Sequence, residues 1–519
     1  MQLKKAFAWF LAIVMLFSMI GAFPMGASAH TGLMPMLHKG PRAVPANITA
    51  NVKPGYGLFR CQLVGSTNGA CYDPYEMRAA YGTDKLIAAG FDGKGKTIVI
   101  VDAYQSPRIV DQLNFFDDWY GLPGLNGLGA ADDATLGTFT QVAPDGLTPY
   151  DPADGNMYGW AGEITLDVEW AHAIAPGANI TLVLAKSNDD ADILSATKYA
   201  VDNNLGDVIS QSFGEDERCV DSKLMKAEHA LFVQATNKHI TLLASSGDDG
   251  ASQPTCDGNS YSKAASSPAS DPLVTAVGGT ELNAAGYCLT SQGCVPAANP
   301  VTGTWQAEVA WNETFFYDPP DNTLPYSIAT GGGYSVLFKA PYFQTLALKG
   351  NKMRGEPDVA YNAAVMHGVL TWVDIPGPAA DGSEDDQGWY RFGGTSAGSP
   401  QWAAIVAIAD QKAGKRLGFI NQALYLYSVN PSKYATLFHD VTSGNNSVVN
   451  YDASMNPTYV KGYNATKGWD ATTGLGSPKV DGLVSFLTKY TLSYADGTKA
   501  IKGSDPANIG RSGPHQMGH

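Results

Sequence analysis

The chain has 519 residues, of which 44% are hydrophobic and 16% are charged, and its formal net charge is −15. This composition is typical of a globular, loop-rich α/β enzyme and argues against a disordered or fibrous protein. The negative charge would repel a phosphate backbone, so we expect no nucleic acid partner.

The first residues predict an export signal. Lys4 and Lys5 precede an apolar stretch at 6–20, and Ala27-Ser28-Ala29 then offers a cleavage site. The apolar stretch is short for a membrane span, and no later stretch is long and apolar enough to anchor the chain. We therefore expect residues 1–29 to be a signal peptide and the protein to be secreted, extracellular and free of a membrane anchor.

Residues 30–71 are punctuated by Pro and Gly and show no clear periodicity. They predict an extended N-terminal arm, or an abbreviated propeptide, with order beginning near Tyr72. From there "DPYEMRAAYG" predicts a helix in which Asp73 is the N-cap and Pro74 is the first residue.

Apolar runs bounded by turn signals alternate with helical patterns through residues 72–490. The runs predict buried parallel strands, and they lie at 96–104, 178–186, 206–214, 240–248 and 272–279, with helices at 190–203 and 222–237 between them. Such alternation indicates an α/β fold with a doubly wound, mostly parallel sheet flanked by helices, in a single large domain. Functional sites in such sheets lie beyond the carboxyl ends of the strands.

The region from 288 to about 341 is predicted to be loop-rich. Its glycine run, 331–333, would let the backbone approach another segment or a ligand closely. The tail 491–519 lacks apolar periodicity, so we expect it to be disordered.

The cysteines fit an oxidising compartment, and their even number permits three disulfide bridges. Close spacing makes 61–71 and 288–294 candidates for local bridges. Zinc is not supported, because the sequence has no CxxC pair and no Cys/His cluster. The six residues are Cys61, Cys71, Cys219, Cys256, Cys288 and Cys294.

The stretch "GGTSAGSP" at 393–400 sets Ser396 among small residues, directly before a helical pattern. A nucleophilic serine at a helix N-terminus fits this arrangement and needs a base to take its proton. None of the nine histidines lies in the His-Gly-Thr-His turn that accompanies a Gly-Thr-Ser motif in subtilisins. A tight small-residue helix cap is the alternative explanation of the motif.

A candidate base lies in the segment 161–173, which predicts a helix with Glu163 and Asp167 four residues apart on one face. Like charges at this spacing destabilise a helix unless they share a proton. For an isolated pattern of this kind, a solvated acidic face that also includes Glu169 is the more common explanation.

Together these motifs resemble the sedolisin family of serine-carboxyl peptidases, which have a subtilisin-like fold with glutamate in place of the catalytic histidine. The resemblance covers roughly residues 72–490. It rests on Glu163, Asp167 and the following "APGA", on "SSGDDG" with Asp248, and on "GGTSAGSP" with Ser396, in the order the family has them.

The resemblance implies a role for each residue. Glu163 would take the proton of Ser396 and return it to the leaving amine, and Asp167 would hold Glu163 through a shared proton. Asp248, kept protonated, would donate to the oxyanion beside the Ser396 N–H. On chemistry alone Asp249 is an equal candidate for this role, or Asp248 is simply a turn residue. Such machinery should work in acid and fade toward neutral pH.

Two positions depart from the family pattern. Asp102 stands where some sedolisins have a glutamate that extends the proton network, and Phe213 stands where those members have a tryptophan. Both changes would weaken the outer network. We still expect the "QSFG" stretch that contains Phe213 to pair with the substrate backbone as an added strand.

The resemblance also implies one structural Ca²⁺ ion, bound by oxygen ligands. "FHDVTSGNN" and "ATKGWDATTGLGSP" match the family's ion site. The ligands would be the side chains of Asp440 and Asp470 and the carbonyl groups of Val441, Thr466 and Gly468.

The sequence therefore predicts a secreted, monomeric endopeptidase that cleaves protein or peptide substrates in acid. A conventional serine peptidase with a histidine base is a second hypothesis. His172 is its nearest candidate, but nine residues of helix after Glu163 it faces away from that carboxyl group. A third hypothesis is an inactive secreted binding protein on a peptidase scaffold. Exopeptidase action is also open.

Overall fold

The computed structural model describes residues 33–489 except for 37, 50–55, 64–65, 67–68, 130, 287–302, 317–324 and 378–384. The expected signal peptide, the expected disordered tail and the pair Cys288–Cys294 lie outside the described residues. In the part of the chain that is described, no helix has the length and apolar character needed to cross a membrane.

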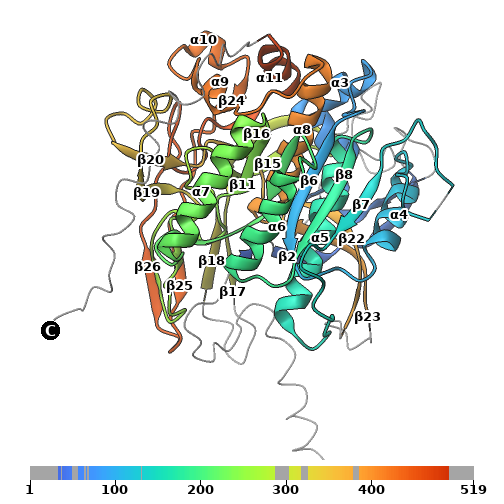
Figure 1. Cartoon of the computed structure of the whole chain (residues 1–519), viewed down its shortest axis with the longest axis horizontal. Coiled ribbons are helices and arrows are strands. Elements are labelled where there is room, and N and C mark those ends of the chain that lie inside the picture. The colour runs from blue at the N-terminus through green and yellow to red at the C-terminus, as the bar shows by residue number, and fades with distance from the viewer. Residues whose placement is uncertain are drawn as a thin grey trace, which may run out of the picture.

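A sheet of eight strands forms the centre of the described structure (Figure 1). Its order is β16-β15-β11-β9-β6-β8-β7, with β21 also paired to β15. All neighbours run parallel except β16, which is antiparallel to β15. This confirms the predicted fold. The strands are β6 (Thr97–Ala103), β7 (Phe139–Val142), β8 (Asn179–Ala185), β9 (Val208–Gln211), β11 (Thr241–Ser245), β15 (Thr275–Ala285), β16 (Thr304–Ala310) and β21 (Val359–Asn362).

Both faces of the sheet are buried, because successive side chains of a strand point to opposite faces. In β6, Ile98 and Ile100 pack into one hydrophobic cluster, and Val99 and Val101 pack into another. The first cluster includes residues of helices α5 (Gly155–Ile174) and α8 (Gly398–Ala413), and the second includes residues of α6 (Asp190–Asp202) and α7 (Ser222–Asn237). Helices α6 and α7 lie in front of the sheet in Figure 1.

Local sequence signals set several helix boundaries. At the start of α2 (Pro74–Tyr81), Asp73 accepts hydrogen bonds from the N–H groups of Tyr75 and Glu76, and Glu76 accepts one from the Asp73 N–H. This capping box confirms the predicted N-cap. Helix α5 begins at Gly155 rather than near Ala161, because Asp154 caps an earlier turn.

The remaining helical segments in the described residues are short. They are α3 (Thr83–Ala88), α4 (Ile109–Tyr120), α9 (Asn421–Tyr425), α10 (Pro431–Tyr434) and α11 (Val480–Leu487), with single 3₁₀ turns at η2 (Arg60–Gln62) and η4 (Thr395–Ala397).

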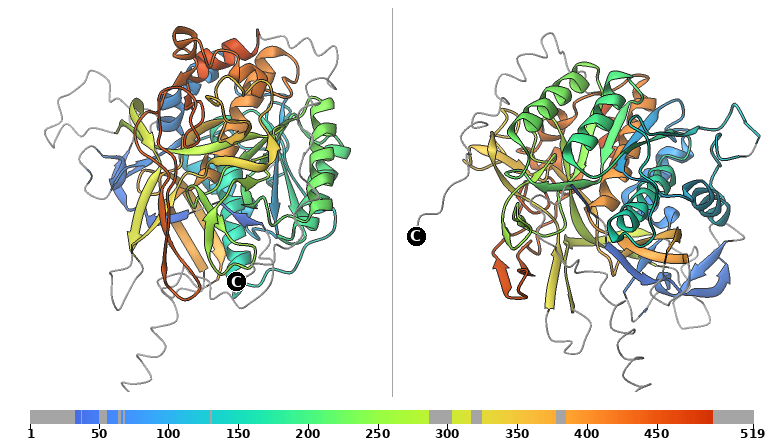
Figure 2. Two further views of the ribbon diagram at one scale, coloured as in Figure 1. Left: turned by 90° about the vertical axis from the view of Figure 1, so that its left-hand side faces the viewer. Right: turned by 60° about the horizontal axis from the view of Figure 1, so that its bottom comes forward.

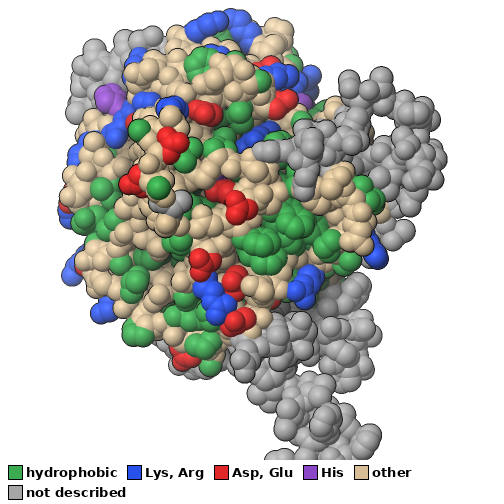
Figure 3. Space-filling model, turned by 90° about the vertical axis from the view of Figure 1, so that its right-hand side faces the viewer, with side chains coloured by type: hydrophobic (Ala, Val, Ile, Leu, Met, Phe, Trp, Pro, Cys, Tyr) green, Lys and Arg blue, Asp and Glu red, His purple; other side chains and the backbone are tan. Residues whose placement is uncertain are grey.

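On the side of the molecule that carries α4 and β7, charged side chains of both signs are scattered around hydrophobic ones (Figure 3). This face therefore shows no broad basic surface for a phosphate backbone.

The region expected to be loop-rich contains strands. Besides β16 it holds β17 (Asn312–Phe316), β18 (Pro325–Ala329) and β19 (Gly333–Lys339). A second ribbon, formed by β25 (Val448–Tyr451) and β26 (Pro457–Val460), projects from the same side of the body as the β17–β18 ribbon (Figures 1 and 2). The other strands are β5 (Cys71–Tyr72), β12 (Ser252–Pro254), β13 (Tyr261–Lys263), β14 (Ser266–Ser267), β20 (Met353–Glu356), β22 (Gly368–Pro376), β23 (Asp385–Gly393), β24 (Phe438–His439) and β27 (Ser477–Pro478).

Secondary structure begins at Met34, so the expectation that order begins near Tyr72 is wrong, whereas the arm or abbreviated propeptide stays a prediction. Strand β1 (Met34–Pro35) pairs with β10 (Phe213–Asp216), and β2 (His38–Arg42) pairs with β23. Strands β3 (Pro45–Thr49) and β4 (Gly57–Phe59) pair with each other. No periodicity was visible because these strands are two to five residues long and the first two take partners far along the chain.

Two disulfide bridges cross-link segments of the described residues. The predicted local bridge Cys61–Cys71 is confirmed, and a second one joins Cys219 to Cys256. No free cysteine is found in the part that the structure describes.

Candidate active site

Ser396 lies in the 3₁₀ turn η4, directly before helix α8, as its sequence motif predicts. The chain enters this turn through Gly394, whose φ of 100° is a conformation that favours glycine. Ser396 is fully buried in the described structure. The turn therefore fixes both the hydroxyl and the backbone N–H of Ser396 at one end of α8.

Glu163 and Asp167 lie on α5, which runs through the core beneath the sheet. Both side chains are fully buried, and so is Glu169. The alternative of a solvated acidic face is therefore wrong. Glu169 accepts a hydrogen bond from the Trp372 N–H at 3.0 Å, away from the serine. Glu163 and Asp167 face the serine turn instead.

Ser212 connects the acidic pair with the serine turn. Its hydroxyl donates to Asp167 Oδ2 at 2.7 Å. Its carbonyl oxygen accepts the Ser396 hydroxyl at 3.3 Å. Ser212 lies between β9 and β10, so the single predicted strand at 206–214 is in fact two strands, and the break between them places this residue at the site.

The Glu163 carboxyl group is adjacent to the serine hydroxyl and to Asp167. Burial raises the pKa of Glu163 well above its usual range, and repulsion from Asp167 and Asp102 raises it further, while the Ser396 hydroxyl lowers it. Neither Glu163 oxygen makes a hydrogen bond of standard geometry within the described residues. The Ser396 proton therefore has an acceptor beside it, although the hydroxyl points to the Ser212 carbonyl oxygen in this structure.

Asp102, at the carboxyl end of β6, adds a third buried carboxyl group. Burial raises its pKa well above the usual range, and Asp167 raises it further. Burial also raises the pKa of Asp167 to about 7, against the lowering effects of the Ser212 hydroxyl and of the adjacent Glu163 carboxyl group. No lysine or arginine forms an ion pair with Asp102, Glu163 or Asp167 in the described part of the chain. Each group therefore holds its proton to higher pH than an exposed carboxyl group does, and the coupled Glu163–Asp167 pair loses its two protons in separate steps.

Asp248 follows β11 and faces the serine turn. Its Oδ1 accepts hydrogen bonds from the Thr395 N–H at 2.8 Å and from the Thr395 hydroxyl at 2.7 Å. Burial raises the pKa of Asp248 well above its usual range. The neighbouring Asp249 pairs instead with Ala329 through its backbone. Of the two candidates left open by chemistry, Asp248 is the one held beside Ser396.

The glycine run supports this turn by close approach to another segment, one of the two possibilities predicted. The Gly331 N–H donates to the Gly247 carbonyl oxygen at 2.6 Å, and the Ser246 hydroxyl donates to the Gly331 carbonyl oxygen at 2.9 Å. A Cβ atom on Gly331 would lie 1.9 Å from the Ser246 carbonyl oxygen. Only glycine permits this contact, which positions the residue before Asp248.

The chain itself covers the serine turn. The Ser396 N–H donates to the Met36 carbonyl oxygen at 3.0 Å, and the Met36 N–H donates to the Ser212 carbonyl oxygen at 3.2 Å. Strand β1 runs antiparallel along β10, with Met34 opposite Gly214 and Pro35 opposite Phe213. The strand that pairs with the "QSFG" stretch here is Met34–Pro35 of the chain itself, and its pairing with a substrate stays a prediction.

His172 does not reach the serine. Its ring Nε2 bonds the Pro123 carbonyl oxygen at 2.8 Å and lies 3.3 Å from Asp117 Oδ1. These partners lie on and after α4, so His172 belongs to the core packing between α4 and α5. The structure removes the support for a histidine base at this position.

The predicted Ca²⁺ ligands come together in two neighbouring loops. The Gly468 N–H donates to both carboxyl oxygens of Asp440, at 3.0 and 3.2 Å, and the Thr466 N–H donates to Asp470 Oδ2 at 2.6 Å. Val441 follows Asp440 directly and is buried. Two carboxylates and nearby carbonyl groups form an oxygen-only set that fits Ca²⁺. The described residues contain no cluster of three or more Asp, Glu, His and Cys side chains suited to a metal, so carbonyl groups would have to complete the set.

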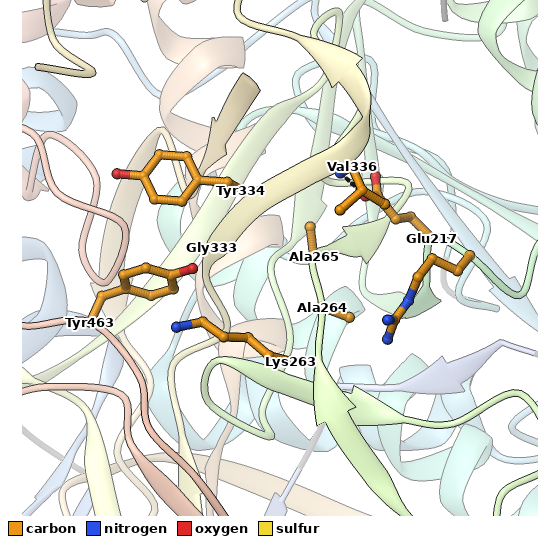
Figure 4. A pocket seen from close by; sticks show the side chains of 9 residues that line it. Glu217, Lys263, Ala264, Ala265, Gly333, Tyr334, Val336 and Tyr463 are labelled. Atoms are coloured by element: carbon orange, nitrogen blue, oxygen red, sulfur yellow. Dashed lines mark hydrogen bonds between the residues drawn. The ribbon is translucent and has the colours of Figure 1, made fainter. Parts of the chain in front are cut away.

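A separate small pocket lies at the far end of β10 (Figure 4). Its volume is about 40 Å³. Glu217 accepts the Val336 N–H there, and Lys263 Nζ lies 3.7 Å from the ring centre of Tyr463. None of the residues that line it belongs to the predicted catalytic set. It is therefore not the candidate site.

Sequence reasoning missed three residues of the site. They are Ser212, Thr395 and Asn188, whose amide donates to the Leu33 carbonyl oxygen at 2.9 Å. Ser212 lies in the "QSFG" stretch and Thr395 lies in "GGTSAGSP", so the motifs were visible but the contacts of these two side chains were not. Asn188 follows β8, at the strand edge where sites of this fold lie, and its position there was the available signal.

The chain matches the family model described as the subtilase family over residues 143–418. It is 31% identical to kumamolisin from Bacillus sp. (strain MN-32), over 78% of this chain and 62% of that protein. It is 27% identical to sedolisin from Pseudomonas sp. (strain 101), over 89% of this chain and 66% of that protein. The match thus spans less than two thirds of either curated relative.

A solved structure is also similar. Pseudomonas sedolisin, described as a serine-carboxyl proteinase in complex with two molecules of pseudo-iodotyrostatin, matches with a TM-score of 0.61 and 27% identity. The match covers 81% of this chain and 98% of that one.

Proposed function

Because this chain belongs to the sedolisin family within the subtilases, we propose that it is a secreted, monomeric serine-carboxyl endopeptidase that hydrolyses protein or peptide substrates in acid. The observation that carries the proposal is the Ser396 N–H bonded to a peptide carbonyl, with the Glu163 carboxyl group beside the serine hydroxyl. A peptide carbonyl so held is polarised toward attack by the Ser396 oxygen.

In the proposed reaction, the Ser396 oxygen attacks the substrate carbonyl carbon and passes its proton to Glu163. Asp167, held by the Ser212 hydroxyl, shares a proton with Glu163 and keeps it in place. Glu163 then protonates the leaving amine, and water hydrolyses the acyl-enzyme by the reverse proton transfers. Asp248 and the Ser396 N–H would stabilise the oxyanion, which requires Asp248 to keep its proton.

The direction of the pKa shifts supports activity in acid. Burial raises the pKa values of Asp248 and of the Glu163–Asp167 pair. Asp248 can donate only while it keeps its proton, and the pair can share a proton only until its second proton leaves. Both functions are lost as pH rises, so the rate should fall. Before its first proton leaves, the pair contains no base, so the rate should also fall at lower pH.

The test is casein hydrolysis across pH by the wild type and by Ser396→Ala, Asp248→Ala and Glu169→Gln. We expect an acidic optimum, no hydrolysis by Ser396→Ala and a loss of about 10²–10³-fold for Asp248→Ala, which removes the donor. Glu169→Gln is the matched control on α5 and should stay active. A neutral optimum, or full activity in Ser396→Ala, would contradict the proposal. A folded wild type that hydrolyses no casein at any pH would favour the hypothesis of an inactive binding protein.

We also propose that one Ca²⁺ ion is held by Asp440 and Asp470 with the carbonyl groups of Val441, Thr466 and Gly468. When bound, the ion would supply a charge that cross-links two loops. The loops contact each other through these residues. Chelation should then lower the melting temperature of the wild type, and Asp440→Asn should abolish that dependence. If chelator leaves the melting temperature of the wild type unchanged, the proposal of a bound Ca²⁺ ion is wrong.

A further inference from the structure

Asn188 holds both polar groups of one backbone residue. The Leu33 N–H donates to the Asn188 carbonyl oxygen at 2.9 Å, and the Asn188 side-chain amide donates to the Leu33 carbonyl oxygen at 2.9 Å. These contacts use only the backbone atoms of the residue that is bound. Asn188 can therefore hold an extended peptide at this point whatever side chain the peptide carries there.

The same stretch of backbone meets the serine turn three residues later. The Met36 carbonyl oxygen accepts the Ser396 N–H at 3.0 Å. Between the two contact points, Met34 lies opposite Gly214 in the antiparallel pairing with β10. If a substrate carbonyl group takes the Met36 position in the proposed reaction, the residue held by Asn188 is the fourth residue before the bond that is cut.

Two donors fix the orientation of the Asn188 side chain. The Tyr104 hydroxyl donates to Asn188 Oδ1 at 2.8 Å, and the Asn156 amide donates to the same oxygen at 3.2 Å. Because the amide oxygen is taken up by these donors, the amide nitrogen is the group that faces Leu33. The donor that binds the peptide backbone is thus positioned by protein contacts alone.

Tyr104 has an unusual backbone conformation. Its φ is 59°, in the left-handed region that bulky residues rarely adopt. Its N–H donates to the Ala185 carbonyl oxygen at 2.9 Å, at the end of β8. Such strain persists only where surrounding contacts impose it, and it is often found at functional sites. Here it accompanies a hydroxyl group that orients Asn188, at the strand edge where sites of this fold lie.

Asn156 connects Asn188 with the helix that carries Glu163. It lies in the first turn of α5, where Asp154 accepts its N–H at 2.8 Å, and its amide also donates to the Tyr104 hydroxyl at 3.2 Å. The ends of β6 and β8 and the start of α5 therefore each contribute one residue to this network. Hydrogen bonds link the backbone-binding residue to the helix of the candidate base.

We propose that Asn188 binds the backbone of the fourth residue before the cleaved bond, with Tyr104 and Asn156 as positioning residues, so that the enzyme favours bonds with at least four residues on their amino-terminal side. The inference rests on the proposed function and adds a chain-length requirement to it. A peptidase that removes tripeptides from a free amino terminus would offer Asn188 no residue to bind. Two ordinary hydrogen bonds favour the longer substrate by about 10–100-fold.

The test uses peptides trimmed from one casein fragment, so that three, four or five residues with a free amino terminus precede the same cut, which mass spectrometry identifies. With the wild type, kcat/KM should rise about 10-fold or more from three to five residues. The ratio for two peptides does not depend on how much enzyme has its site covered by Leu33–Met36, because both peptides meet the same free enzyme. An equal or higher rate for the three-residue peptide would overturn the inference.

Variants assign the effect to the named residues. Asn188→Ala loses the amide but keeps the backbone carbonyl group, so the five-to-three ratio should fall about 3–10-fold. Tyr104→Phe frees the amide to turn, so it should lower the ratio about 2–5-fold and leave kcat/KM for the three-residue peptide within about 2-fold. Asp189→Ala is the matched control, because this exposed neighbour has no capping bond, and it should keep the wild-type ratio. A wild-type ratio in Asn188→Ala would contradict the inference.

A second measurement needs no variant of the enzyme. N-methylation of the fourth residue before the cut removes the N–H that the Asn188 carbonyl group would accept, so wild-type kcat/KM should fall about 3–10-fold. N-methylation of the second residue is the control. Pro35 takes that position in the bound segment without an N–H, so the rate should change less than about 2-fold. Equal losses at the two positions would count against Asn188.

Casein hydrolysis separates this inference from the proposed function. If the wild type cleaves casein in acid but cuts the three-residue and five-residue peptides equally well, the inference fails and the proposed function stands. If the wild type cleaves neither casein nor any of the peptides, both fail.

Discussion

Two groups of buried acidic side chains differ in how their charge is satisfied. Asp358 is fully buried and forms a two-pronged ion pair with Arg354, at 2.8 and 2.6 Å. The Tyr425 hydroxyl and the Ala276 N–H donate to it as well, each at 2.8 Å. Asp102, Glu163 and Asp167 are buried equally deeply with no such cation, and most of their oxygens have no hydrogen-bond partner in the described residues.

The difference shows how one residue type serves two purposes in one core. A buried carboxylate that is paired and hydrogen-bonded keeps its charge and ties segments together. Buried carboxyl groups without a cation keep their protons instead, because charge without compensation is costly in a poorly solvated interior. The ion pair of Asp358 holds the start of β21 against β20 and α9. The carboxyl groups without a cation keep protons close to Ser396.

The largest expected effect tests whether the unpaired group acts in chemistry. Glu163→Gln keeps the size of the side chain and removes the base, so kcat should fall about 10²–10⁴-fold. The melting temperature should change little, because a protonated carboxyl group and an amide are both neutral. Steady-state kinetics on casein, with circular dichroism as a control for folding, measure both. If the variant keeps the wild-type kcat, Glu163 is not the base and serves the structure, as Asp358 does.

The next effect tests the paired group. Asp358→Asn leaves Arg354 buried without its counter-charge, so the free energy of unfolding should fall by about 3–5 kcal/mol. Urea denaturation in mild acid measures the loss. Asp102→Asn under the same conditions should cost less than about 1 kcal/mol, because Asp102 has no hydrogen bond to lose in the described residues. Equal costs would remove the contrast between the two groups.

The pH dependence of stability extends the contrast to the whole core. Burial raises the pKa of Asp410 and of Glu356 to about 8. A raised pKa stabilises the folded state below the ordinary carboxyl value and loses that contribution as pH rises through the folded value. The melting temperature should therefore be higher at about pH 4 than at about pH 8. Differential scanning calorimetry gives the answer, and a melting temperature that rises toward pH 8 would contradict it.

The smallest effect concerns Asp102 in catalysis. Asp102→Asn removes a group that, once it has lost its proton, raises the pKa of Glu163 by repulsion. The alkaline limb of the pH–rate profile should move to lower pH by less than about 1 pH unit, with kcat changed less than about 10-fold. A shift in the opposite direction would show that Asp102 does not raise the Glu163 pKa through its charge.

Local patterns were sufficient to predict most of the central fold. The runs that became β6, β8 and β11 are buried on both faces, so their apolar character is continuous and visible in the sequence. Helix α7 has the predicted bounds, Ser222–Asn237. The turn around Ser396 was visible because its small residues are required by the geometry of the turn itself.

Contacts between distant segments could not be predicted in this way. Strand β1 is only two residues long, and it is recognisable as a strand only because β10 offers an edge some 180 residues later, with Met34 opposite Gly214. The choice of Asp248 over Asp249 came from resemblance until the Thr395 contacts were seen. The break between β9 and β10, which places Ser212 at the site, carries no local signal either.

The segment Leu33–Met36, which lies over the serine turn, affects how inhibitor affinities are measured. A covalently attached occupant competes with any added ligand at an effective concentration on the order of millimolar. Affinities measured on protein that keeps this segment would then be weaker than those of the same site without it.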